Sequence, residues 1–161
     1  MPAVSPDVVL HPLTGKERTL GDQVALFHLV TVVLDPFTYE SSWLLETAGR
    51  ILTGFAEADC RVGFVLTSDV AGAKEFLGPW ADRLMAFADP DRHFVKALGL
   101  SELPAFVHIE HDCSIAGLAE GWDPATWRPI AENLAAVMSW IRPAIPETGD
   151  PVPYPGTPAL A

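Results

Sequence analysis

The sequence predicts an α/β domain in which a mixed central sheet is flanked by helices on both faces. Two apolar runs without polar alternation, Val24 to Leu34 and Val62 to Leu66, are typical of strands covered on both faces, and each precedes a segment of helical periodicity. Two further strands around a turn and a last helix follow. This order implies parallel central strands with an added antiparallel pair. A chain of 161 residues is long enough for one domain with a sizeable core.

The first half of the chain is divided by clear turn signals. Val8 to Leu20 holds two short apolar pieces around Thr14 and Gly15, which predicts a hairpin. Asp35 and Pro36 end the first central strand, because proline has no amide hydrogen for the sheet and fixes its own backbone. Glu40 to Glu57 is predicted to be an amphipathic helix from the apolar spacing of Leu44, Ala48, Ile51, Leu52 and Phe55.

The second half continues the alternation of strands and helices. After the strand at Val62 to Leu66, Ser68 or Asp69 is placed to cap a helix that carries Val70, Ala73, Leu77 and Trp80 on its apolar side. A short strand at Leu84 to Phe87 precedes a helix that begins near Asp89 and ends at Gly99. The remaining elements are two antiparallel strands, Ala105 to Glu110 and Ser114 to Ala119, and a helix capped by Asp123 with Pro124 in its first turn.

A proline-rich tail follows this domain. Residues 143–161 contain six prolines, so neither a helix nor a central strand can continue there. We therefore expect a domain over residues 1–142 and an extended segment over residues 143–161, which is either solvated or laid along a groove.

Charge and cysteine content exclude several classes of function. Ten basic against 21 acidic side chains give a net charge of -11, which repels phosphate backbones and anionic headgroups. No run is long enough for a spanning helix, and the first residues lack the pattern of a secretory signal. Cys60 and Cys113 match no metal-binding or CxxC spacing. We expect a cytoplasmic protein with reduced thiols and no cofactor, nucleic-acid partner or membrane partner.

Three segments together resemble a known family. Ser101 to Glu110, with Pro104 at the start of a strand, looks like the thioredoxin-fold segment in which a proline opens the fourth strand, usually with a cis peptide bond. Ala88 to Leu100 is similar to the preceding segment of peroxiredoxins and TlpA-like proteins (the AhpC/TSA type), and Leu13 to Leu20 to their opening hairpin. The resemblance covers about residues 7–142 and implies a thioredoxin-like three-layer sandwich with an N-terminal β-hairpin.

The departures from this family concern its chemistry. Thioredoxins carry CxxC in the loop that enters the first long helix, and peroxiredoxins carry a threonine followed three residues later by the peroxidatic cysteine. Here Thr38 and Ser41 have the peroxiredoxin spacing, with serine in the cysteine position. A serine hydroxyl cannot supply the low-pKa thiolate that attacks peroxide or disulfide sulfur. The peroxiredoxin arginine of the later strand is also missing, because Pro104 stands where it is expected.

The altered loop allows two interpretations. Thr38, Tyr39, Glu40, Ser41 and Ser42 lie at the predicted start of a helix, where free amides favour an anion or an activated nucleophile. A non-redox enzyme would use Tyr39 or Glu40 there as acid or base. The simpler interpretation is that Thr38, Ser41 or Ser42 caps the helix and satisfies its free amides.

A binding surface is the second implication of the resemblance. In thioredoxin-like proteins the backbone beside the cis proline pairs with an extended peptide, and this pairing does not depend on the cysteines. Transferred to this sequence, Leu103 and Pro104 would form that edge, with Pro36 and Phe37 beside it. The alternative is a strand-edge proline that has no partner. If the edge is functional, binding by strand addition is the expected activity.

Histidines and cysteines elsewhere suggest weaker alternatives. His108, Glu110, His111 and Cys113 could attract zinc, but their spacing matches no common zinc motif, and a polar hairpin end explains them. Cys113 stands at a turn, where an exposed thiol is expected, whereas Cys60 begins a strand and is expected to be buried. His28 is interpreted as a core histidine, and Trp122 could line the rim of a surface groove.

These observations support one leading hypothesis and one main alternative. The leading hypothesis is a redox-inactive, non-catalytic thioredoxin-like protein that binds a protein or peptide, as a chaperone or assembly factor does. The alternative is an atypical thiol oxidoreductase or peroxidase that uses Cys113 or Cys60. A structural subunit whose tail wraps a neighbour is a third, weaker possibility, and the sequence leaves open whether the chain forms a homodimer.

Overall fold

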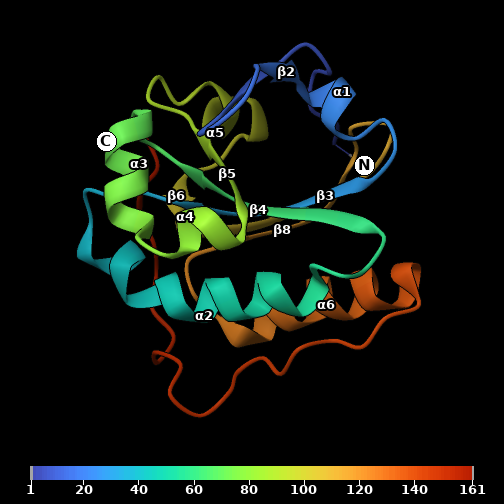
Figure 1. Cartoon of the computed structure of the whole chain (residues 1–161). Coiled ribbons are helices and arrows are strands. Elements are labelled where there is room, and N and C mark those ends of the chain that lie inside the picture. The colour runs from blue at the N-terminus through green and yellow to red at the C-terminus, as the bar shows by residue number, and fades with distance from the viewer. Residues whose placement is uncertain (1, 161) are drawn as a thin grey trace.

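The computed structural model describes residues 2–160, which form a curled seven-stranded sheet with helices on both faces (Figure 1). The strands lie in the order β2-β1-β5-β4-β3-β7-β8. β3, β4 and β5 are parallel, and the other neighbouring pairs are antiparallel. The strands of this sheet are β1 (Val9–Pro12), β2 (Arg18–Thr19), β3 (His28–Leu34), β4 (Cys60–Leu66), β5 (Met85–Ala88), β7 (Ala105–Ile109) and β8 (Ile115–Glu120).

Six helices complete the layers in the described part of the chain. α2 and α6 lie beside each other below the sheet in Figure 1, whereas α1 and α5 lie above it. The helices are α1 (Leu20–Gln23), α2 (Tyr39–Phe55), α3 (Val70–Leu77), α4 (Trp80–Arg83), α5 (His93–Leu98) and α6 (Pro124–Met138). The mixed sheet, the opening hairpin and the flanking helices are therefore as predicted.

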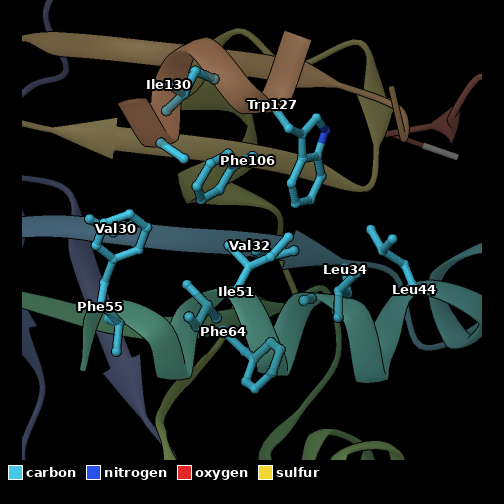
Figure 2. Packing of buried hydrophobic residues seen from close by; sticks show 14 of the residues in the cluster. Val30, Val32, Leu34, Leu44, Ile51, Phe55, Phe64, Phe106, Trp127 and Ile130 are labelled. Carbon is cyan, nitrogen blue, oxygen red and sulfur yellow. The ribbon is translucent and has the colours of Figure 1, made fainter. Parts of the chain in front are cut away.

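The sheet separates two hydrophobic clusters. The first fills the space between the sheet and the helices α2, α3, α4 and α6, and Figure 2 shows its centre, where Val30 and Val32 of β3 face Phe106 and Trp127. Phe106 and Trp127 stack with ring centroids 4.8 Å apart. The second cluster packs on the opposite face, under α1 and α5. Because β3 is covered on both faces, all seven of its residues are buried, as its apolar run indicates.

Most predicted boundaries lie close to the observed ones, and the exceptions have local causes. The first central strand begins at His28 rather than Val24, because the preceding residues form the short helix α1, for which Val24 is the C-cap. The predicted helix through Trp80 is divided into α3 and α4, because Gly78 has a φ of +54° and Pro79 follows it. Asp123 caps α6 by accepting a hydrogen bond from the Ala125 amide.

The proline-rich segment is extended and lies against the domain. In Figure 1 it runs below α2 and α6 and then rises toward α3. Ile145 is buried in the first cluster and Ala159 in the second. Near its end the segment forms β9 (Thr157–Pro158), which pairs antiparallel with β6 (Glu102–Leu103) in a separate two-stranded sheet. Among residues 2–160 no helix has the length and apolar character needed to cross a membrane.

Candidate functional site

The loop between β3 and α2 is held by hydrogen bonds among its own residues. The Ser41 side chain is fully buried, and its Oγ accepts a hydrogen bond of 2.9 Å from the Asp35 amide. The Thr38 hydroxyl donates to the Asp35 carbonyl at 3.0 Å, and the Phe37 amide donates to the Asp35 carboxylate at 2.9 Å. Ser41 therefore fixes the end of β3 to the first turn of α2.

The prediction that Thr38, Ser41 or Ser42 caps this helix is wrong. Thr38 occupies the N-cap position, but its side chain makes no capping hydrogen bond. The hydroxyl groups of Thr38 and Ser42 instead donate to backbone carbonyls, and Ser41 accepts from a residue that precedes the helix. The Thr38 and Ser41 side chains are thus bonded to Asp35 and the Ser42 hydroxyl to the Tyr39 carbonyl, so none of the three caps the free amides of the first turn.

Arg92 is a site residue that the sequence analysis missed. Its guanidinium lies 3.7 Å from the Asp35 carboxylate and also donates a hydrogen bond to the Ala159 carbonyl. Arg92 has a left-handed backbone with a φ of +59° and directly precedes α5. It thus connects the loop after β3 with the end of the proline-rich segment. Nothing in the sequence around Arg92 indicates this role, because Asp35, Arg92 and Ala159 lie far apart in the chain.

The second part of the site is the β6 edge, which we define as residues Glu102 and Leu103. The Leu103–Pro104 peptide bond is cis, and both residues are buried. Leu103 is the register partner of Thr157, and Glu102 that of Pro158. The Ala159 amide donates to the Ser101 carbonyl at 2.9 Å. The backbone edge that the resemblance assigns to a bound peptide is therefore paired with the protein's own chain.

An exposed aromatic surface borders this site. Phe37, Tyr39 and Trp43, in the loop and the first turns of α2, are 76%, 80% and 57% exposed. The Trp43 ring meets the Tyr154 ring edge to face, with centroids 5.8 Å apart. Of the predicted binding residues, Phe37 is thus accessible, Pro36 is partly buried, and Leu103 and Pro104 are covered. Large exposed aromatic side chains are enriched where proteins bind partners.

Both cysteines lie away from this loop. Cys60 begins β4, at the end of the sheet opposite the loop, and belongs to the first hydrophobic cluster, whereas Cys113 belongs to the second, on the other face of the sheet. Both thiols are free and buried, so the expectation that Cys113 is exposed is wrong. Burial raises the pKa of the Cys60 thiol to about 11, and burial also raises the pKa of Cys113. Neither thiol has the accessible, low-pKa character of a redox cysteine.

Two of the histidines, His28 and His108, form a close pair. His28 Nδ1 and His108 Nε2 lie 2.8 Å apart, and the His111 ring meets the His28 ring edge to face. Burial, and next the proximity of His28, lower the pKa of His108 to about 4. Within residues 2–160 no group of three or more His, Cys, Asp or Glu side chains is arranged to hold a metal ion. Trp122 is fully buried rather than at the rim of a groove.

The geometry can be compared with known proteins. The sequence matches no family model and no curated protein. Solved structures do match, among them a thiol:disulfide interchange protein DsbE from Chlorobium tepidum, with a TM-score of 0.69 and 15% identity over 84% of this chain and 96% of that one. The chain has the thioredoxin-like fold. A cysteine-to-serine variant of PrxQ from Xylella fastidiosa matches with a TM-score of 0.66 and 17% identity, over 85% of this chain and 97% of that one.

A third match covers the proline-rich segment as well. A hypothetical protein from Sinorhizobium meliloti aligns over 99% of this chain and 94% of its own, with a TM-score of 0.69 and 13% identity. The expected resemblance to the peroxiredoxin and TlpA-like branch is confirmed by the DsbE-type and peroxiredoxin Q neighbours. At these identities the likeness establishes the fold, and the activity has to be argued from the site.

Proposed function

We propose that this thioredoxin-like protein is redox-inactive and binds an extended protein or peptide segment by adding it as a strand to the β6 edge. The observation that carries the proposal is the pairing of Leu103 with Thr157, in which this edge takes up an extended segment of the protein's own chain. The exposed aromatic side chains beside the site provide apolar contact area for the same partner. A chaperone or assembly factor would have these properties.

The chemistry of the loop supports a binding role. The hydroxyl of Ser41 stands at the family's cysteine position, is buried, and is occupied by the Asp35 amide. A nucleophilic serine needs a base within hydrogen-bond reach, whereas this oxygen accepts a backbone hydrogen bond. Phe37 and Tyr39 reach the surface beside it and offer large aromatic contact area to a partner.

The binding proposal is tested with an array of extended peptides and three forms of the full chain. We expect the wild type to bind a subset of the peptides and Phe37→Ser to bind that subset at least five-fold more weakly. The matched control is Leu26→Ser, since Leu26 is 75% exposed but precedes β3 at the other end of the sheet. Absence of binding at roughly 100 μM peptide, or equal loss in both variants, contradicts the proposal.

An atypical thiol oxidoreductase or peroxidase is the second candidate. The comparisons favour it, because several neighbours are named as a disulfide oxidoreductase, a thiol:disulfide interchange protein or a peroxiredoxin. The burial and raised pKa of both thiols weigh against it. Peroxide and insulin-disulfide turnover with a dithiol reductant separates the two candidates. Turnover that disappears in Cys113→Ser or Cys60→Ser would replace the binding proposal.

A further inference from the structure

The proline-rich segment is attached to the domain in two parts of different character. The part within residues 140–154 is held by polar contacts at partly exposed positions: Arg50 forms ion pairs of 2.7 Å with Asp150 and 3.0 Å with Glu147. Trp122 donates from its indole to the Pro151 carbonyl at 2.7 Å and exchanges two backbone hydrogen bonds with Tyr154. The hydroxyl of Tyr154 donates to the Glu40 carbonyl. None of these contacts involves a residue beyond Tyr154, so we expect them to persist when the residues after Tyr154 are released.

Residues 156–160 form the second part, which we name the terminal strand. It contains β9 and is held mainly by the β6 edge, through the register pairs of Leu103 with Thr157 and of Glu102 with Pro158. The Gly156 amide donates to the Glu102 carboxylate at 3.2 Å. Pro158 and Leu160 face solvent, and only Ala159 is fully buried. Within the terminal strand, burial of apolar surface is therefore concentrated at Ala159.

The residues of the terminal strand define what the β6 edge accommodates. A Cβ atom at Gly156 would lie 2.6 Å from the Leu103 carbonyl oxygen, so only glycine allows the chain to approach this closely. Ala159 is fully buried in the second hydrophobic cluster, where close packing favours a small side chain. Pro158 is exposed and needs no hydrogen-bond donor at its position. The pattern is glycine, a polar residue, proline and alanine in an extended conformation.

We propose that the terminal strand is an internal ligand, and that the partner of this protein is an extended segment of the same pattern, Gly-Thr-Pro-Ala or close to it, which displaces it. The inference rests on the proposed binding function and adds the ligand's chemistry and its regulation. Because Arg92 donates a hydrogen bond to the Ala159 carbonyl, the corresponding carbonyl of an incoming segment would take the place of that acceptor.

The terminal strand competes with an external peptide for the β6 edge, and its advantage follows from its covalent attachment to the domain. A short flexible tether holds its ligand at an effective concentration of about 1 mM. If a free segment binds the vacant edge with a Kd of roughly 10 μM, the tethered strand is bound about 100 times more often than it is free. The apparent affinity for an external peptide is then about 100-fold weaker than the affinity of the vacant edge.

The test uses full-length variants and a fluorescent peptide with the sequence of residues 153–160. Gly156→Val prevents the terminal strand from docking, because the added side chain collides with the Leu103 carbonyl, while the contacts of residues 140–154 remain. Pro155→Ala is the matched control, since Pro155 is exposed and directly precedes Gly156. We expect Gly156→Val to bind the peptide at least ten-fold more tightly than the wild type and Pro155→Ala, as measured by fluorescence anisotropy.

The outcomes separate the inference from the proposed function. Equal peptide affinity in the wild type and both variants refutes competition by the terminal strand, but it does not contradict binding by strand addition. No binding of this peptide to Gly156→Val, combined with no binding in the peptide array, refutes both. Hydrogen exchange of the wild type gives a second readout that needs no variant: saturating peptide should accelerate exchange of the amides of the terminal strand and leave those of residues 145–154 unchanged. Unchanged exchange in both segments contradicts the inference.

Discussion

Acidification should destabilise the protein through the buried histidine pair. His108 is fully buried, its Nε2 lies 2.8 Å from His28 Nδ1, and burial lowers its pKa from 6.5 to about 4. In the unfolded chain the same imidazole takes up a proton at pH 6.5, so between pH 6.5 and 4 the unfolded state binds more protons than the folded state. The stabilisation due to neutral His108 is thus complete above pH 6.5 and is lost as the pH falls toward 4.

The magnitude follows from the difference between the two pKa values. The full loss is about 3 kcal/mol, at 1.36 kcal/mol for each pH unit, and about 2 kcal/mol of it falls between pH 7 and pH 5. The pKa of His28 is also lowered, first by burial and then by the charge of His111, while Glu110 and Asp112 act in the opposite direction. Part of the decrease in free energy of unfolding attributed to His108 therefore belongs to the His28–His108 pair.

Urea unfolding followed by tryptophan fluorescence measures this effect at pH 7 and pH 5. His108→Gln removes the titrating ring and keeps a polar side chain beside His28, so its free energy of unfolding should fall by about 2 kcal/mol less than that of the wild type over this range. His93→Gln is the control, because His93 is exposed at the start of α5. An equal decrease in the wild type and His108→Gln would show that the buried pair does not control the acid response.

Three further predictions concern the thiols and two close contacts. Cys60 and Cys113 should react with a disulfide reagent at pH 8 at least 100-fold more slowly in the native protein than in denaturant, because both thiols are buried and have raised pKa values. Rapid reaction of either thiol in the native protein would contradict this prediction. Gly63→Ala should lower the free energy of unfolding by about 2 kcal/mol, because the new methyl group would lie 2.5 Å from the Met85 carbonyl oxygen; a neutral effect in urea unfolding would be inconsistent with that contact. Asp89→Ala should lower the free energy of unfolding by about 2 kcal/mol in the same assay, because the Asp89 carboxylate accepts hydrogen bonds from two backbone amides at the start of α5. A decrease below about 0.5 kcal/mol would mean that water replaces these hydrogen bonds.

The fold could be predicted because its signals are local and repeated. The apolar run that becomes β3, the cap at Asp123 and the helical spacing around Leu44 each specify an element from neighbouring residues. The errors occurred where backbone conformation mattered more than pattern. Residues 20–23 form a helical turn, and a positive φ at Gly78 divides a helix that the spacing of apolar residues predicts as continuous.

The site was predictable only in part, because its contacts join distant segments. The sequence indicates that residues 143–161 are extended, but six prolines do not specify what they pack against. The segment docks on the β6 edge because Ala159 is buried in the second cluster and Gly156 lies close to the Leu103 carbonyl. Both contacts join residues that are far apart in the chain. The same holds for His28 and His108, which are 80 residues apart in the chain.

Replacement of Ser41 by cysteine tests whether one atom separates this protein from the thiol peroxidases. The substitution supplies the missing sulfur, but the side chain at this position is fully buried and accepts the Asp35 amide hydrogen bond. A peroxide has to reach the sulfur, and a reactive thiolate needs an accessible, electropositive surrounding. We therefore expect Ser41→Cys to show no more peroxide turnover than the wild type.

The neighbouring position provides the matched control for this substitution. Ser42 is exposed, so the new thiol of Ser42→Cys should react with a disulfide reagent at the rate of an accessible cysteine, whereas that of Ser41→Cys should react as slowly as the native thiols. Peroxide turnover in Ser41→Cys would contradict this reasoning, because it would mean that the loop opens far enough to admit substrate. In that case the serine at position 41 would by itself explain the absence of peroxidase activity. The binding role of the β6 edge would then depend on the peptide-binding measurements alone.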